Sequence, residues 1–289
     1  SVLRNYAAGP GIRVEEVPFD PATGRLDLGV LRSAVSAGDV TGLLADVPNG
    51  FGHLDESLPE LKGVLGEALL VVSADPLALT VLEAPGAYGA DVVVGEGQAF
   101  GTALSFGGPY LGLFACALEQ VRRLPGRIVG ETVDAEGRRA FVTTLRAREQ
   151  DIRREKATSN VCTNQTLMAV AAAVQLGWLG TQGLREVATR SARGAHYLFE
   201  RVSALPGVSA VSRAPFLREF CVSVPGPADE ALAAMADRGF LAGLSVTSLT
   251  GGADASLEDD EGAILVAVTE RRTRAELDGY AEALAEVIK

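Results

Sequence analysis

Residues 91–109 read DVVVGEGQAFGTALSFGGP, an apolar segment that runs directly into a glycine-rich loop. Val92, Val93 and Val94 are β-branched, which is typical of a buried strand. In open parallel sheets, ligands bind beyond the carboxyl ends of the strands, where such a loop lies. The loop therefore either cradles a phosphate group or serves only to turn the chain.

Further short apolar runs precede this strand at residues 42–47 and 69–73. Helix-like segments lie between the runs, at residues 54–65 and 76–82. Strands that alternate with helices predict an α/β fold with a mostly parallel sheet. A strand-like stretch at residues 12–18 is reached almost at once, so we expect the chain to open partway through a larger fold.

The second half of the chain begins with helical periodicity and then mixes strands with helices. The expected helices span residues 167–176, 182–205 and 228–238, and the expected strands span residues 220–224 and 263–268. Thr273 and Glu276 form a capping box that starts a last helix. We predict a large domain at residues 1–180 and a small α+β domain at residues 181–289.

The composition argues against several classes of partner. The 289 residues carry a net charge of −11, which disfavours binding to the phosphate backbone of nucleic acid. No apolar run is long enough to span a bilayer, so we expect a cytoplasmic protein that does not bind membranes. Three cysteines (Cys116, Cys162 and Cys221) and two histidines (His53 and His196) fit no metal-binding spacing, so no metal is expected.

The glycine clusters and the isolated polar residues each admit two interpretations. Residues 95–101 do not match GxGxxG, and Glu96 is acidic where a phosphate would sit, so a tight turn is favoured over a phosphate loop. The second cluster, residues 106–112, serves a turn or lets a ligand approach closely. His53 is a general base or, more commonly, a structural histidine, and Ser105 lies in no nucleophile elbow.

Residues 146–164, RAREQDIRREKATSNVCTN, are dense in charged side chains. On a surface helix these charges would form solvated pairs. The end of the stretch joins Lys156 to three small hydrogen-bonding side chains, Thr158, Ser159 and Asn160, ahead of the next helix. These groups suit a phosphate, and they equally suit plain helix capping.

Taken together, these stretches resemble subunit 1 of the two-subunit glycine decarboxylase, the P-protein of the glycine cleavage system. The similar residues are 48–52, 89–98, 106–109, 125–130 and 148–160. The resemblance covers most of the chain and is most specific in residues 148–160, where Asp151 replaces an expected histidine or tyrosine.

The resemblance implies a fold-type-I PLP-transferase-like large domain, with its N-terminal part missing, and a small C-terminal α+β domain. It implies an enzyme that decarboxylates glycine with pyridoxal phosphate (PLP) and passes the aminomethyl group to a lipoyl carrier protein. The Schiff-base lysine of the sister subunit 2 falls on Gln98, and its pyridinium-binding aspartate falls near Val72, with Asp75 close by. An amide cannot form an aldimine, so we expect no catalytic residue here and PLP held covalently by the partner subunit.

In related fold-type-I dimers, a loop of one subunit binds the cofactor phosphate of its neighbour. By this resemblance, Lys156, Thr158, Ser159 and Asn160 contact the phosphate of the partner's PLP and so help to process an amino acid substrate. Three alternatives remain: a pseudoenzyme that stabilises another PLP protein, a shortened relative acting on another amino acid in a specialised pathway, and a self-sufficient PLP enzyme using Lys156. The position of Lys156 argues against the last.

Overall fold

The structure is a computed structural model that describes residues 2–20, 22–124, 126–148, 150–157, 165–247 and 260–289. They form two compact units, one made of Ser1–Ala68 with Glu186–Lys289 and the other of Leu69–Arg185. Packing thus joins the two ends of the chain in one unit. The division into domains at residues 1–180 and 181–289 stays a prediction.

The first unit contains helices from both ends of the chain and an antiparallel sheet. Its helices are α1 (Val2–Ala8), α2 (Leu28–Ser36), α3 (Leu58–Leu65), α6 (Ala228–Asp237) and α8 (Arg274–Val287). Its strands are β1 (Gly42–Val47), β7 (Ser209–Ala210), β8 (Glu219–Ser223), β9 (Leu244–Ser245) and β10 (Ala263–Ala267). The last four form a sheet in the order β7-β8-β10-β9, in which every neighbouring pair is antiparallel.

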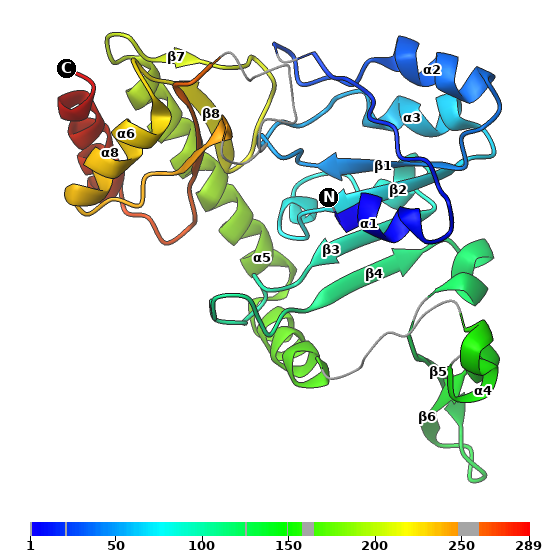
Figure 1. Cartoon of the computed structure of the whole chain (residues 1–289). Helices are drawn as coiled ribbons and strands as arrows, with labels where there is room; N and C mark the ends of the chain where they lie inside the picture. The colour runs from blue at the N-terminus through cyan, green and yellow to red at the C-terminus, as the bar shows by residue number, and fades with distance from the viewer. Residues whose placement is uncertain (1, 21, 125, 149, 158–164, 248–259) are drawn as a thin grey trace. The chain divides into compact units, whose positions relative to one another are not determined.

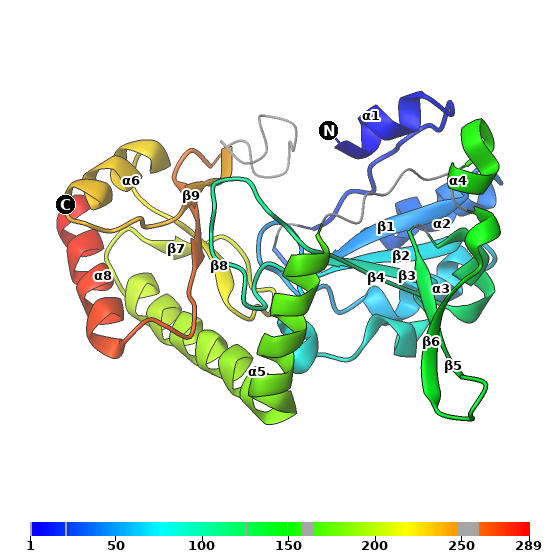
Figure 2. The same ribbon diagram turned by 90° about the horizontal axis from the view of Figure 1, so that it is seen from below.

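The main core of the first unit lies between this sheet and three helices, α6, α8 and the C-terminal part of α5 (Thr166–Ser203), which Figures 1 and 2 show beside the strands. Phe220 and Val222 of β8 pack with Leu198, Met235 and Leu284 from the helices. Each is almost fully buried, which stabilises the fold by about 1.5–3 kcal/mol per side chain. The alternating direction of side chains turns the intervening residue of β8 to the other face of the sheet.

The second unit is built on a mixed sheet. The unit contributes β2 (Leu69–Ala74), β3 (Val92–Glu96) and β4 (Gly112–Cys116) to this sheet. It also contains a separate pair of strands, β5 (Ile128–Val133) and β6 (Arg139–Thr144), and the helices α4 (Gln150–Arg153) and the first part of α5. Short 3-10 turns lie at Ala78–Thr80, Pro85–Tyr88, Leu118–Arg123, Arg146–Arg148 and Arg154–Lys156. Strands β2 and β3 are parallel, and β3 and β4 are antiparallel. This arrangement confirms the predicted α/β class.

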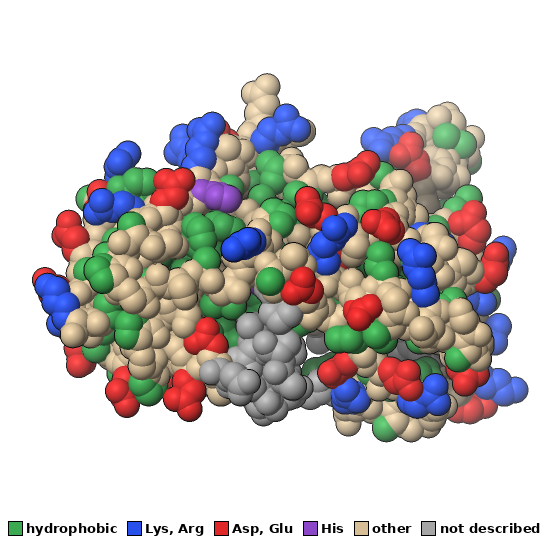
Figure 3. All heavy atoms as spheres, turned by 90° about the horizontal axis from the view of Figure 1, so that it is seen from above, with side chains coloured by type: hydrophobic (Ala, Val, Ile, Leu, Met, Phe, Trp, Pro, Cys, Tyr) green, Lys and Arg blue, Asp and Glu red, His purple; other side chains and the backbone are tan. Residues whose placement is uncertain are grey.

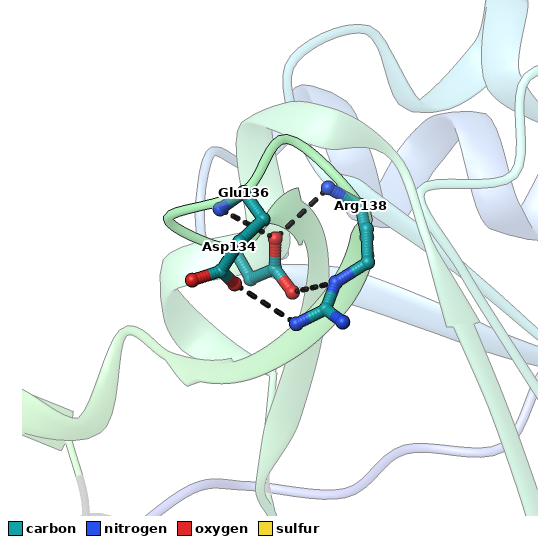
Figure 4. A network of polar contacts seen from close by, with 3 residues as sticks. All are labelled: Asp134, Glu136 and Arg138. Atoms are coloured by element: carbon teal, nitrogen blue, oxygen red, sulfur yellow. Dashed lines mark hydrogen bonds and ion pairs between the residues drawn. The ribbon is translucent and has the colours of Figure 1, made fainter.

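Strands β5 and β6 form a two-stranded hairpin whose turn is closed by one aspartate (Figure 4). One Asp134 carboxylate oxygen accepts hydrogen bonds from the backbone N–H groups of Glu136 and Arg138, both at 2.9 Å. The other oxygen accepts from Arg138 Nε at 2.7 Å, while Arg138 also binds Glu136 at 2.8 Å. These hydrogen bonds lower the pKa of Asp134, although its carboxylate faces solvent.

Two of the predicted elements are wrong. No strand forms at residues 12–18; an isolated bridge joins Phe19, just after them, to Leu26. The helix expected at residues 76–82 is reduced to the 3-10 turn Ala78–Thr80. The hydroxyl group of Thr80 donates to the carbonyl oxygen of Leu77, a local bond that competes with an α-helix.

Candidate functional site

The loop that follows β3 is a tightly packed turn. A Cβ added to Gly95 would lie 2.7 Å from the carbonyl oxygen of Ala74, so only glycine fits there. One carboxylate oxygen of Glu96 accepts hydrogen bonds from the backbone N–H groups of Gln98 and Leu111, each at 3.0 Å. These donors are occupied by an acidic side chain of the chain itself, which explains why the loop is no phosphate cradle.

Gln98 completes the turn with its side chain. Its amide Nε2 donates a hydrogen bond of 2.6 Å to the carbonyl oxygen of Thr102. Its backbone carbonyl accepts one from Thr102 N at 3.2 Å. The side-chain amide thus stabilises the loop through its hydrogen bond. It supplies no nucleophile at the position where the resemblance places a lysine.

Residues 103–110 line a hollow of about 240 Å³ together with Gln98. Phe106 is held at φ 53°, and Gly107 and Gly108 follow at φ 119° and 139°, so three successive residues have positive φ. Positive φ is uncommon for a residue other than glycine, and for a bulky one it marks local strain. The second glycine cluster is therefore a strained turn beside the hollow.

The position assigned to the pyridinium-binding aspartate is apolar. Val72 is fully buried in β2, opposite Val93 of β3. The nearby carboxylate of Asp75 lies just past the end of β2 and accepts a hydrogen bond from the backbone N–H of Leu77 at 3.0 Å. The residues present thus do not fit PLP as a covalently held cofactor of this chain.

The predicted phosphate contacts fall mostly outside the described residues. Thr158, Ser159 and Asn160 lie there. Lys156 is described: it ends the 3-10 turn Arg154–Lys156, and its side chain is exposed. The structure therefore places one of the four predicted residues, at a surface position, and leaves the other three as predictions.

Within the described residues, the charged stretch that leads to Lys156 forms the short helix α4 and two 3-10 turns. Asp151, which stands where the family was expected to have histidine or tyrosine, pairs with Arg146 at 2.5 Å. Both side chains are about half exposed, so the pair contributes at most about 1 kcal/mol. Arg153 instead donates from Nε to the carbonyl oxygen of Ala147 at 3.2 Å.

Two further candidate residues of the sequence, His53 and Cys221, lie in the first unit. His53 is buried, and burial lowers its pKa, while its Nδ1 has no hydrogen-bond partner in the described chain. Burial also raises the pKa of the Cys221 thiol to about 12, with Glu219 and Asp260 adding to the effect, so this thiol is no nucleophile. Within the described residues, no group of three or more His, Cys, Asp or Glu side chains is arranged to hold a metal ion.

The surface charge is mixed. On the face drawn in Figure 3, Lys and Arg side chains lie among Asp and Glu side chains and form no large basic patch.

Among the described residues, one helix, α5, is long and apolar enough to cross a membrane by length and composition alone. Gly180, at φ 60° and ψ −177°, interrupts it after 14 residues, which is fewer than the roughly 20 that a bilayer requires.

Comparison with known proteins identifies the family of this chain. The sequence matches the model of the glycine cleavage system P-protein over residues 1–284. The chain belongs to the glycine cleavage system P-protein family. A probable glycine dehydrogenase (decarboxylating) subunit 1 from Chlorobium limicola is 46% identical over 292 residues, which cover 99% of this chain and 62% of that protein. The chain thus spans about 62% of the length of this relative.

Solved structures support the same family and fold. A crystal structure of glycine decarboxylase (P-protein) of the glycine cleavage system, in inhibitor-bound form, superposes with a TM-score of 0.86 at 40% identity, covering 99% of this chain and 62% of that one. A NifS-like protein superposes with a TM-score of 0.66 at 16% identity, covering 98% of this chain and 70% of that one, which shows the fold alone. The resemblance drawn from the motifs is therefore confirmed, as is the fold-type-I PLP-transferase-like fold.

The sequence indicates that Gln98 stands in place of a lysine, but it does not reveal the hydrogen bonds that Gln98 forms. The partner of its amide, Thr102, lies four residues further along a loop without regular periodicity, so no pattern marks it. The acidic charge of Glu96 predicts that the loop disfavours phosphate, and the structure shows that this side chain also organises the loop.

Proposed function

We propose that this chain is the non-lysine-bearing subunit of a heteromeric, PLP-dependent glycine-decarboxylating enzyme, and that it completes the active site of its partner. The observation that carries the proposal is Gln98 in the loop after β3, whose amide is hydrogen-bonded to Thr102 where a catalytic subunit would need a lysine. The relatives' name, glycine dehydrogenase (decarboxylating) subunit 1, supports both the reaction and a second subunit.

The lysines of the chain support the assignment of PLP to the partner. There are three, Lys62, Lys156 and Lys289. Lys62 donates to the carbonyl oxygen of Ala68 at 3.0 Å in the first unit, and Lys289 is the last residue. Lys156 is exposed on a short turn, whereas a Schiff-base lysine has to be held against its cofactor.

This chain's contribution would be to bind and orient. Lys156, Thr158, Ser159 and Asn160 would hold the phosphate of the partner's PLP through charge and hydrogen bonds. When bound to the partner, PLP supplies the electron sink for the decarboxylation of glycine. A lipoyl carrier protein would accept the aminomethyl group, and the assembly would work in the cytoplasm.

The first test is an absorbance spectrum of the purified chain with PLP, before and after borohydride, followed by mass spectrometry. We expect no aldimine band and no covalent adduct. An adduct on Lys156 would show that this chain is a PLP enzyme by itself, and would overturn the proposal.

The second test measures the partner's affinity for PLP in the complex. Thr158→Ala removes a proposed phosphate donor and is expected to weaken PLP binding about tenfold, the equivalent of one charge-assisted hydrogen bond. Thr143→Ala, on the exposed β6 strand, is the matched control and should leave the affinity unchanged. Equal affinities for both variants would favour a pseudoenzyme that only stabilises the catalytic subunit.

A further inference from the structure

Strands β5 and β6 form a sheet of two strands, and no further described strand pairs with either of its outer edges. Figure 1 shows this hairpin extending away from strands β2, β3 and β4 of the same unit. A two-stranded hairpin is only marginally stable alone in water, and an edge with free N–H and C=O groups is a template for pairing with another chain. Both outer edges of the hairpin are therefore candidate sites for the addition of a strand.

The alternating pattern of an antiparallel ladder decides which backbone groups of β6 point outward. The N–H of Asp134 donates to the carbonyl oxygen of Arg138 at 2.9 Å, so these residues form a hydrogen-bonded pair at the turn. Because such pairs alternate, residues 139, 141 and 143 belong to the pairs that share no hydrogen bonds with β5. Their N–H and C=O groups point away from β5, and none of these groups bonds to a loop or turn of the described chain.

The sequence of β6 is complementary to itself when it pairs antiparallel with a second copy. If Phe141 lies opposite Phe141 of the second copy, Arg139 lies opposite Thr143 of that copy. In this register each copy uses all three of its outward N–H groups as donors and all three outward carbonyl oxygens as acceptors. An aromatic pair lies at the centre and no like charges are directly opposite, and both features favour pairing.

The outer edge of β5 is less suited to such pairing. By the same alternation, its outward groups belong to Val129, Glu131 and Val133. Pairing centred on Glu131 would place two glutamates directly opposite each other, which is destabilising. Pairing of β5 with β6 of another copy is a head-to-tail contact, which does not by itself close into a dimer. The edge of β6 is therefore the one that can join two copies.

The charges at the two ends of the hairpin favour the antiparallel arrangement. Residues 131–139, around the turn, carry three carboxylates against two guanidinium groups. Arg127 and Arg146 lie at the open end, and both are exposed. The register centred on Phe141 places Glu136 of one copy opposite Arg146 of the other, whereas a parallel arrangement would bring like ends together.

We infer that this chain forms a dimer through the outer edge of β6, in which two hairpins make one four-stranded antiparallel sheet centred on Phe141. The side chains of the hairpin are already braced for this role: the guanidinium of Arg139 lies 5.0 Å from the centre of the Phe141 ring and binds Glu131 of β5 at 2.8 Å. The ring of Phe141 is 62% exposed in the single chain, so it is available to a second copy. The inference does not depend on the proposed function, because it concerns contacts between copies of this chain alone.

The test is sedimentation equilibrium of the full chain, in which we expect a dimer with a dissociation constant in the micromolar range, because one strand pair buries less surface than a standard interface. Phe141→Pro removes an N–H that points outward and leaves the bonds to β5 in place. Each copy loses a hydrogen bond, so the dissociation constant should rise at least about tenfold. Glu131→Pro is the matched control: it lies directly across the hairpin, its N–H points to the other edge, and it should leave dimerisation unchanged. Circular dichroism verifies that each variant is folded.

A second experiment tests the register by exchanging charges. Glu136→Arg and Arg146→Glu should each raise the dissociation constant about fivefold, because each places like charges opposite one another. The double variant restores opposite charges and should dimerise as the wild type does. Failure of the double variant to recover would overturn the inferred pairing.

Two further outcomes would overturn the inference. A wild-type chain that remains monomeric at about 100 μM would show that the edge does not join two copies. If Phe141→Pro then weakened binding of the lysine-bearing subunit, that subunit would be the occupant of the edge. Equal weakening of the dimer by Phe141→Pro and Glu131→Pro would mean that the contact does not use the edge of β6. None of these results bears on whether the chain completes the active site of a PLP enzyme.

Discussion

At the residue scale, the chemistry of the loop after β3 depends on one side chain. A lysine at residue 98 would offer an amine, whereas Gln98 offers an amide that is already bonded to the backbone of Thr102. This difference was predictable from the sequence, because it needs only the register of a motif. The hydrogen bond to Thr102 was not predictable, because it depends on how the loop of 15 residues between β3 and β4 closes.

His53 is the residue for which we predict a pH dependence. Burial lowers its pKa in the folded state below the ordinary value of about 6.5, so the unfolded chain binds the proton more readily. Its contribution to stability is therefore full above about pH 6.5 and is lost as the pH falls through and below that value. The loss approaches at most about 1.4 kcal/mol per pH unit for one proton.

The measurement is the free energy of urea unfolding at several pH values between 5 and 8. In His53→Gln, which has no group titrating at this site, stability should fall less steeply on acidification than in the wild type. Identical slopes in the two proteins would contradict the assignment of a buried neutral imidazole.

At the scale of single elements, local sequence patterns predicted the helices and strands that bury one face. The expected strand at residues 42–47 is β1 as observed, and the capping box of Thr273 and Glu276 begins α8. The β5–β6 hairpin was missed because it has no consistent apolar side: Val129, Val133 and Phe141 are all exposed. A hairpin that buries neither face leaves no period-2 pattern to find.

The kink of α5 yields a prediction with a matched control. Gly180 adopts φ 60° and ψ −177°, a region open almost only to glycine, although nothing lies within 4 Å of an added Cβ. Gly180→Ala should thus destabilise the protein by about 1–3 kcal/mol through backbone strain alone. Gly177→Ala, in the same helix and equally free of neighbours, should stabilise it by about 0.5–1 kcal/mol, since alanine favours a helix.

Urea unfolding followed by circular dichroism, with the fluorescence of the adjacent Trp178 as a local probe, distinguishes the two variants. A stabilising Gly180→Ala would mean that the helix runs straight through residue 180.

At the scale of the whole molecule, the first unit joins segments that are far apart in sequence. The turn at residues 48–53 lies against β8: Cys221 Sγ donates to the carbonyl oxygen of Phe51 at 3.5 Å, and Leu54 N donates to that of Pro215 at 2.8 Å. Such pairings leave no local signal, which is why the sequence could not predict that Ser1–Ala68 packs with Glu186–Lys289. The motif at residues 48–52 was visible in the sequence, but its packing partner was not.

Gly52 is the point where this long-range packing is tightest. A Cβ there would lie 2.3 Å from the backbone oxygen of Glu219, and its φ is +79°, so both the backbone and the neighbouring strand would have to move. Gly52→Ala should therefore cost about 3 kcal/mol or more in the free energy of unfolding. Gly50→Ala is the control, because nothing lies within 4 Å of a Cβ at Gly50 and it should shift stability by less than about 1 kcal/mol. Hydrogen exchange should further show β8 losing protection in Gly52→Ala only; equal protection in both variants would mean that the N-terminal turn does not seat on this strand.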